Sequence, residues 1–151
     1  MYEAAVATVS HRLPRTPHTV SRSRANLRAQ LTAWGMLPHD VATAELILSE
    51  LVTNAVQHAG NPPRRQVEVG FRLDADSSLL RLEVADACAD LPRPRSADLA
   101  PGPDAESGRG LLLVTALADD WGVTPRPHDI GKTVWAELKL TQLIDGDQGQ
   151  P

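Results

Sequence analysis

Apolar residues recur at helical spacing in two consecutive segments near the start of the chain. The first covers residues 19–34 and is followed by Gly35, a typical helix stop. The second covers residues 41–58, contains neither glycine nor proline, and ends at an Ala-Gly-Asn-Pro-Pro run. Its apolar stripe consists of Val41, Ala44, Leu48, Leu51, Val52 and Ala55. The pattern therefore predicts two successive amphipathic helices.

Strict alternation of apolar and polar residues predicts strands after these helices. Residues 67–73 and 80–84 alternate in this way and are separated by a short polar turn, which is typical of an antiparallel hairpin. Residues 134–140 form a third alternating run. Shorter segments at 2–10 and 121–124 are also predicted strands.

Three remaining segments complete the expected organisation. Residues 11–17 hold two prolines and predict a loop. Residues 87–107 are proline-rich without apolar periodicity, and a loop of this length is usually a lid, a binding loop or disordered. Gly108-Arg109-Gly110 then leads into a third predicted helix at 111–120. The order β-α-α-β-β-loop-α-β-β predicts a two-layer α/β sandwich, with a mixed, mainly antiparallel sheet covered by helices on one face.

Composition narrows the class of protein. With 151 residues and 42% hydrophobic residues, we expect one domain at 1–141 and a flexible polar tail at 142–151. The net charge of −4 argues against nucleic-acid binding through bulk charge. No run approaches the roughly 20 apolar residues of a membrane span, the N-terminus lacks a signal-peptide pattern, and Cys88 is the one cysteine. We therefore expect a cytoplasmic protein that does not bind membranes.

The second predicted helix carries a row of polar side chains beside its apolar stripe. Glu50, Asn54 and His58 are spaced i, i+4 and i+8, so they lie on one side of the helix. Carboxylate and amide oxygens suit Mg²⁺, and a carboxylate one turn away is placed to deprotonate a nucleophile. A solvated helix face is the alternative interpretation.

Asp86 follows a predicted strand and shares the parity of its apolar residues Leu80, Leu82 and Val84. It is therefore expected to point to the buried side, where a carboxylate needs a hydrogen-bond donor such as a ligand amino group. The alternative is that the strand ends earlier and Asp86 caps a turn.

Two further short patterns contain glycine. Gly108 and Gly110 precede a predicted helix, whose N-terminal N–H groups attract phosphate. Gly131-Lys132-Thr133 looks like the end of a P-loop, but an alternating strand follows it where a P-loop needs a helix. That interpretation is rejected, and Thr133 remains as a polar strand residue that faces a site.

In combination and in this order, these motifs resemble the ATP-binding superfamily shared by gyrase, Hsp90, histidine kinases and mismatch-repair ATPases. Residues 50–59 look like its N-box, Asp86 like its adenine-binding aspartate, and Gly108 to Leu111 like its second glycine box. Thr133 resembles the threonine that closes the adenine site. The resemblance implies the Bergerat, or histidine-kinase-like, ATPase fold, with ATP and Mg²⁺ as cofactors.

The short chain is most similar to the stand-alone anti-sigma factor kinases, because a phosphoacceptor hairpin or a transducer domain does not fit in its length. This implies a serine-protein kinase that phosphorylates an anti-sigma factor antagonist of the STAS type and sequesters a sigma factor. Glu50 would be the general base, Asn54 would hold Mg²⁺, and residues 87–107 would form the ATP lid. The implied nucleotide-binding residues are Asn54, His58, Asp86, Cys88, Gly108, Arg109, Gly110, Leu111 and Thr133.

One departure from the family keeps a second hypothesis open. The first glycine box usually has the form Asp-x-Gly-x-Gly, and here both glycines are replaced, by Cys88 and Asp90. The alternative function is a regulatory binding module, with or without bound ATP, that lacks phosphotransfer activity.

Two surface features concern partners. Family relatives form homodimers, so we expect one here, and an exposed first strand would pair across it. Arg22, Arg24 and Arg28 form a basic face on the first helix, which either docks an acidic partner or is solvated.

Overall fold

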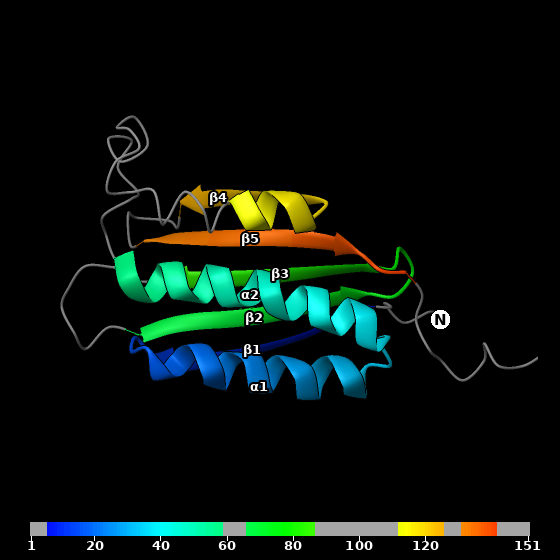
Figure 1. Ribbon diagram of the computed structural model, residues 1–151, viewed down its shortest axis with the longest axis horizontal. Coiled ribbons are helices and arrows are strands. Elements are labelled where there is room, and N and C mark those ends of the chain that lie inside the picture. The colour runs from blue at the N-terminus through cyan, green and yellow to red at the C-terminus, as the bar shows by residue number, and fades with distance from the viewer. Residues whose placement is uncertain (1–5, 59–65, 87–111, 126–130, 142–151) are drawn as a thin grey trace, which may run out of the picture.

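One sheet and the helices that cover one of its faces form two layers in the computed structural model (Figure 1). The structure describes residues 6–58, 66–86, 112–125 and 131–141. A short helix at 112–117 precedes β4. The other elements are β1 (Val6–Pro14), α1 (His18–Ala33), α2 (Pro38–His58), β2 (Gln66–Asp74), β3 (Leu79–Asp86), β4 (Asp120–Pro125) and β5 (Lys132–Lys139).

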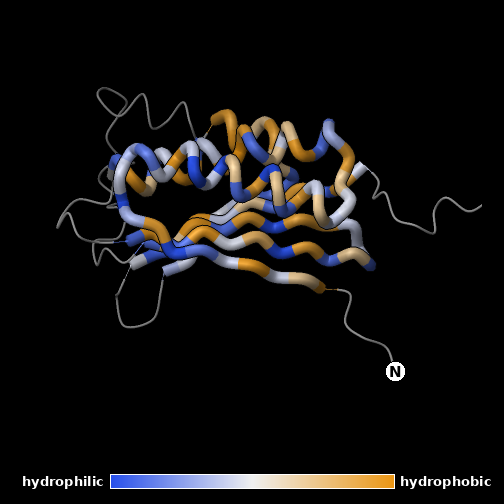
Figure 2. The backbone as a smooth tube through the Cα atoms, turned by 90° about the horizontal axis from the view of Figure 1, so that it is seen from below, coloured by the Kyte–Doolittle hydropathy of each residue, from blue (hydrophilic) through white to orange (hydrophobic). Residues whose placement is uncertain are grey.

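The five strands follow the order β1-β2-β3-β5-β4, and all four pairings are antiparallel. In the turned view of Figure 2, the helices form a separate layer over one face of the sheet. This arrangement confirms the predicted two-layer α/β sandwich with a mainly antiparallel sheet.

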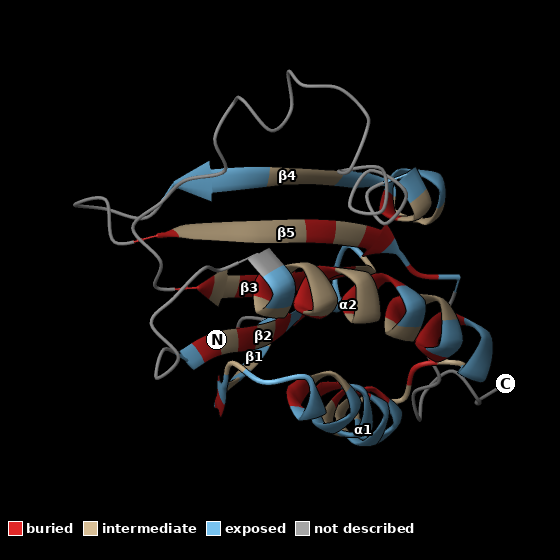
Figure 3. Ribbon diagram, turned by 60° about the vertical axis from the view of Figure 1, so that its left-hand side comes forward, coloured by how far each residue is buried: buried red, intermediate tan, exposed pale blue. Residues whose placement is uncertain are grey.

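The core lies between the sheet and the two long helices. Because side chains alternate along a strand, one face of β2 and β3 carries the apolar residues that the sequence pattern placed together. The same alternation continues on β5, and the buried positions concentrate where α2 lies over the sheet (Figure 3). The fully buried large side chains are Leu27, Leu31, Ile47, Leu48, Leu51, Val52, Val67, Val69, Phe71, Leu80, Leu82 and Val84.

The first strand extends further than the sequence pattern predicted. A strand was expected at 2–10 and a loop at 11–17, whereas β1 continues to Pro14 and pairs with β2 along its whole length. Leu13 is buried and belongs to the core. The alternation of more and less exposed side chains therefore continues past His11. Pro14 is tolerated because β1 is an edge strand, where one ladder N–H is not needed.

The helix ends follow local backbone signals. Gly35 has a φ of 84°, and the Met36 N–H donates to the Leu31 carbonyl at 3.0 Å, so α1 stops at the predicted glycine. The helix at 112–117 is shorter than the expected 111–120. It ends early because Asp119 already bonds β5: its N–H donates to the Glu137 carbonyl, and its carboxylate accepts from the Lys139 N–H. Among the described residues, no helix is both long and apolar enough to cross a membrane.

Asp40 ties the start of α2 to the segment after β5. Its carboxylate is 4% exposed and accepts from both the backbone N–H and the hydroxyl of Thr141, at 2.9 and 3.0 Å. These two bonds join residues 101 positions apart in the chain. They therefore hold the C-terminal end of the sheet against the helix that carries the candidate site.

We expect Asp40→Ala to lower the free energy of unfolding by about 2–3 kcal/mol, since hydrogen bonds to charged groups contribute about 1.5–3 kcal/mol. The matched control is Asp76→Ala, in the exposed β2–β3 turn, which should change stability by less than about 0.5 kcal/mol. Urea unfolding monitored by circular dichroism measures both. Equal stabilities of the two variants would contradict a structural role for Asp40.

Candidate functional site

The two sides of α2 carry acidic residues with different partners. On one side, the Glu45 carboxylate accepts from Arg24 and Arg28 of α1, at 3.0 and 2.6 Å. With 3.6 residues per turn, Glu50 is rotated by about 140° and Asn54 by about 180° from Glu45. Glu50 and Asn54 therefore lie on the flank of α2 that faces away from α1.

The ion pairs of Glu45 involve the basic face of α1. Arg24 and Arg28, which the sequence offered as a docking surface, are engaged within the molecule by Glu45. Both remain about half exposed, at 46% and 51%. The cluster thus holds α1 against α2, and a docking role for it stays a prediction.

The flank with Glu50 and Asn54 leads to the end of the sheet at which β3 ends. The C-terminal end of α2 lies beside the end of β3, and the helix at 112–117 lies on the far side of α2 from α1 (Figures 1 and 3). Glu50 and Asn54 are both partly exposed, so they are accessible to a ligand or solvent while their helix is fixed in the core.

Asp86 is the last residue of β3 and lies on the covered side of the sheet. It is 3% exposed, as its shared parity with Leu80, Leu82 and Val84 predicted. Its Oδ2 accepts a hydrogen bond from Nζ of Lys132 at 3.0 Å, and the Lys132 side chain is only 13% exposed. The end of β3 therefore presents a buried ion pair, and the strand does not end before Asp86.

Lys132 is the residue that the sequence analysis missed. It pairs directly with Asp86 across β3 and β5. A signal for it was present, because Lys132 shares the parity of Val134, Ala136 and Leu138, whose side chains face the core. In the sequence, Lys132 stands between Gly131 and Thr133, in a segment that resembles the end of a P-loop.

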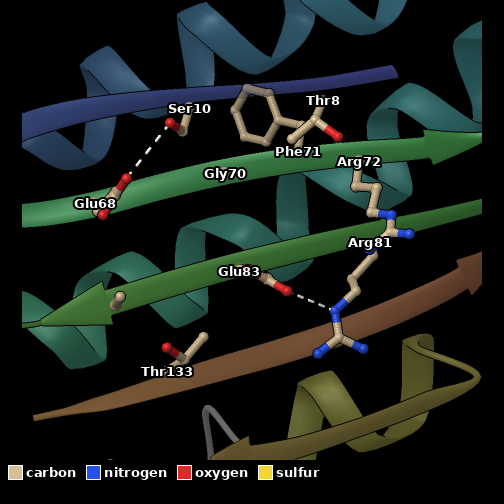
Figure 4. A pocket seen from close by; sticks show the side chains of 10 residues that line it. Thr8, Ser10, Glu68, Gly70, Phe71, Arg72, Arg81, Glu83 and Thr133 are labelled. Carbon is tan, nitrogen blue, oxygen red and sulfur yellow. Dashed lines mark hydrogen bonds and ion pairs between the residues drawn. The ribbon is translucent and has the colours of Figure 1, made fainter. Parts of the chain in front are cut away.

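Thr133 lies on the opposite side of the sheet from Asp86. It pairs with Ala85, and its side chain projects from the face that no helix covers (Figure 4). There it lines a shallow hollow of about 330 Å³, together with Thr8, Ser10 and Arg81. The structure thus does not bring Thr133 together with Asp86. Lys132 instead occupies the position opposite Asp86 that was expected for Thr133.

The uncovered face has its own charged cluster around Arg81. Its guanidinium contacts Glu83 at 2.7 Å and Glu137 at 2.9 Å, and lies 4.3 Å from the ring centre of Trp135. Burial alone would lower the pKa of Arg81, but hydrogen bonds and charge interactions with both glutamates outweigh burial and raise this pKa. The raised pKa keeps Arg81 in its charged form, paired with both glutamates on the face of the sheet opposite Asp86.

Several predicted site residues lie outside the described residues. These include Cys88, the lid segment 87–107 and the glycine box Gly108-Arg109-Gly110-Leu111. His58 is the last residue of α2, one turn beyond Asn54, and its side chain is likewise not described. The described part of the site therefore consists of Glu50, Asn54, Asp86 and Lys132.

The pattern that defines the histidine kinase-like ATPase domain matches residues 13–138. The chain belongs to this family. The match includes α2, β3 and most of β5, so every described site residue of this histidine kinase-like ATPase domain falls within it. No curated protein matches the chain.

Two solved structures show the same fold. One contains the RsbU and RsbW domains of Rv1364c from Mycobacterium tuberculosis: the TM-score is 0.65, the identity 21%, and the match covers 92% of this chain and 35% of that one. The other is the histidine kinase domain of the blue-light activated histidine kinase of Erythrobacter litoralis EL346, with a TM-score of 0.50, 21% identity, and 85% and 62% coverage. The ATPase domain thus spans about a third and three fifths of these chains.

Membership in the family implies ATP binding, and the described residues fit that ligand. Asp86 is a buried carboxylate that a purine amino group can contact as donor. Asn54 carries a partly exposed amide one turn from Glu50. Among the described residues, no group of three or more His, Cys, Asp or Glu residues forms a metal cage.

Proposed function

We propose that this chain is an ATP- and Mg²⁺-dependent protein kinase that phosphorylates a serine of a separate protein. The substrate we infer is an anti-sigma factor antagonist of the STAS type, and the second partner is a sigma factor that the kinase sequesters. The observation that carries the proposal is the shared flank of Glu50 and Asn54, which lies next to the strand end that holds Asp86.

We assign each described residue a role that its position supports. Glu50 is partly exposed and takes no part in the Glu45 ion pairs, so its carboxylate is available to accept the proton of a serine hydroxyl. Asn54, one turn further along, would hold Mg²⁺ near the same point. Phosphoryl transfer depends mainly on positioning and charge neutralisation, which rigid elements such as α2 provide.

The base of the nucleotide would be recognised at the other end of the site. Asp86 is fixed by its strand and by Lys132, so a purine amino group meets a preorganised acceptor. From the resemblance, backbone N–H groups of Gly108, Gly110 and Leu111 would contact the phosphates, and residues 87–107 would cover them.

The choice of the anti-sigma branch rests on the resemblance of the sequence motifs to anti-sigma factor kinases. The similarity in fold to a chain that includes an RsbW domain is consistent with it. The homodimer stays a prediction, and β1 has the position that such pairing requires, because it lies at the edge of the sheet.

Incubation of the protein with γ-labelled ATP, Mg²⁺ and the antagonist encoded nearest its gene tests the proposal. We expect label on the antagonist in an acid-stable, alkali-labile form, as phosphoserine gives, and none when Mg²⁺ is chelated. Acid-labile label on the protein itself would instead indicate histidine phosphorylation. If the protein binds ATP but neither it nor the antagonist becomes labelled, the kinase proposal is contradicted.

The second candidate function is a regulatory binding module without phosphotransfer. The replacement of two expected glycines by Cys88 and Asp90 favours it, because side chains there limit the close approach of backbone and nucleotide. Such a module would still bind its partners, and a pulldown with the antagonist would succeed without any transfer of label.

A further inference from the structure

The ion pair between Lys132 and Asp86 is placed where the proposed nucleotide site recognises its base. The two residues are direct partners across β3 and β5, and both share the parity of the core residues of their strands. Nζ of Lys132 is 3.0 Å from Oδ2 of Asp86, and the two side chains are 13% and 3% exposed. A lysine is rarely held this far from solvent unless it is paired.

Stability alone does not account for this pair. The desolvation of two charges opposes their attraction, so a buried ion pair often stabilises a fold no better than apolar residues of similar size. The neighbouring inward positions on both strands are indeed apolar, with Val84 opposite Val134 and Leu82 opposite Ala136. The charged pair appears only at the end of the strands, where the ligand site begins.

The hydrogen-bonding capacity of Lys132 also indicates a role beyond stability. An ammonium has three N–H donors, and among the described residues Asp86 is the acceptor that Nζ contacts. This contact uses one of the three donors. A ligand that offers an acceptor beside the carboxylate would use a second donor.

We propose that Lys132 is a specificity-determining residue of the nucleotide site, whose ammonium donates directly to a ring nitrogen of adenine. In adenine the exocyclic amino group is flanked by two ring acceptors, N1 and N7. A carboxylate oxygen and an ammonium placed side by side present an acceptor and a donor to this edge. The amino group donates to Asp86, and one of the flanking nitrogens accepts from Lys132. This inference rests on the proposed function, because it assigns a second contact within the same site.

Two adenine analogues test this contact. The affinities of ATP, 1-deaza-ATP and 7-deaza-ATP are measured by calorimetry for the wild type and for Lys132→Met, which keeps the apolar stem and removes the donor. We expect one analogue to bind the wild type about tenfold to hundredfold more weakly than ATP, as for loss of a hydrogen bond to a charged group. The same analogue should bind Lys132→Met within about twofold of ATP.

The matched control is Lys139→Met, since Lys139 is the other lysine of the chain and lies exposed on the same strand. It should retain the wild-type preference among the three nucleotides. If Lys132→Met does not fold, the same comparison is made with Asp86→Asn/Lys132→Met, in which neither side chain is left as an unpaired charge.

The outcomes separate this inference from the proposed function. A merely structural role for Lys132 would weaken all three nucleotides by the same factor in the variant, and that result would overturn the inference while leaving ATP binding intact. Failure of the wild type to bind ATP would overturn the proposed function and the inference together.

Discussion

Glu50→Gln is expected to reduce phosphoryl transfer to the antagonist by about 10²–10⁴-fold, the range that a positioned general base contributes. The substitution keeps the size of the side chain and removes its ability to accept a proton. Because Glu50 is on a partly exposed flank of α2 and not in the core, the fold and the ATP affinity should change little. Initial rates of label transfer at saturating ATP measure the effect.

Glu45→Gln is the matched control for this experiment. Glu45 lies on the same helix but faces α1, where it pairs with Arg24 and Arg28. Its replacement should leave the transfer rate within about twofold of the wild type, since exposed ion pairs contribute about 0.2–1 kcal/mol to stability. A Glu50→Gln protein that transfers phosphate at the wild-type rate would remove Glu50 from the mechanism.

Asp86→Asn is expected to weaken ATP binding by about tenfold to hundredfold. The change keeps the shape of the side chain and replaces a charged acceptor with a neutral one, and hydrogen bonds to charged groups contribute about 1.5–3 kcal/mol. It also leaves the ammonium of Lys132 without its counter-charge in a partly buried position. Calorimetric titration with ATP in the presence of Mg²⁺ measures the loss.

Glu83→Gln controls for the loss of a carboxylate on the same strand. Glu83 lies three residues before Asp86 and points to the uncovered face, where it pairs with Arg81. This variant should bind ATP like the wild type. Equal ATP affinities of the Asp86→Asn and wild-type proteins, with both shown to be folded, would place the adenine site elsewhere.

The fold was predictable because the hydrophobic pattern is unambiguous in its central part. The alternation on β2 and β3 and the stripe on α2 each specify one buried face, and these elements form the core. The predicted first strand ends too early, at residue 10, because Pro14 and Pro17 favour a loop in the local pattern. Only the pairing with β2 shows that β1 is an edge strand, and pairing between distant segments is not visible in local pattern.

The site was predictable where a side chain's orientation follows from its own element. Glu50 and Asn54 share a flank because helical spacing places them there, and Asp86 is buried because its strand parity requires it. The face of Lys132 also follows from its own strand, because it shares the parity of Val134 and Ala136. Its contact with Asp86 depends in addition on the register of β3 and β5, which the local pattern does not show.

The central claim is that the covered face of the sheet, at the end of β3, binds a purine nucleotide with Mg²⁺. Calorimetric titration of the wild-type protein with ATP, with and without Mg²⁺, tests it most directly. The proposed function predicts saturable binding of one ATP per chain that weakens markedly when Mg²⁺ is chelated. Absence of saturable binding at millimolar ATP in the presence of Mg²⁺ would contradict the account.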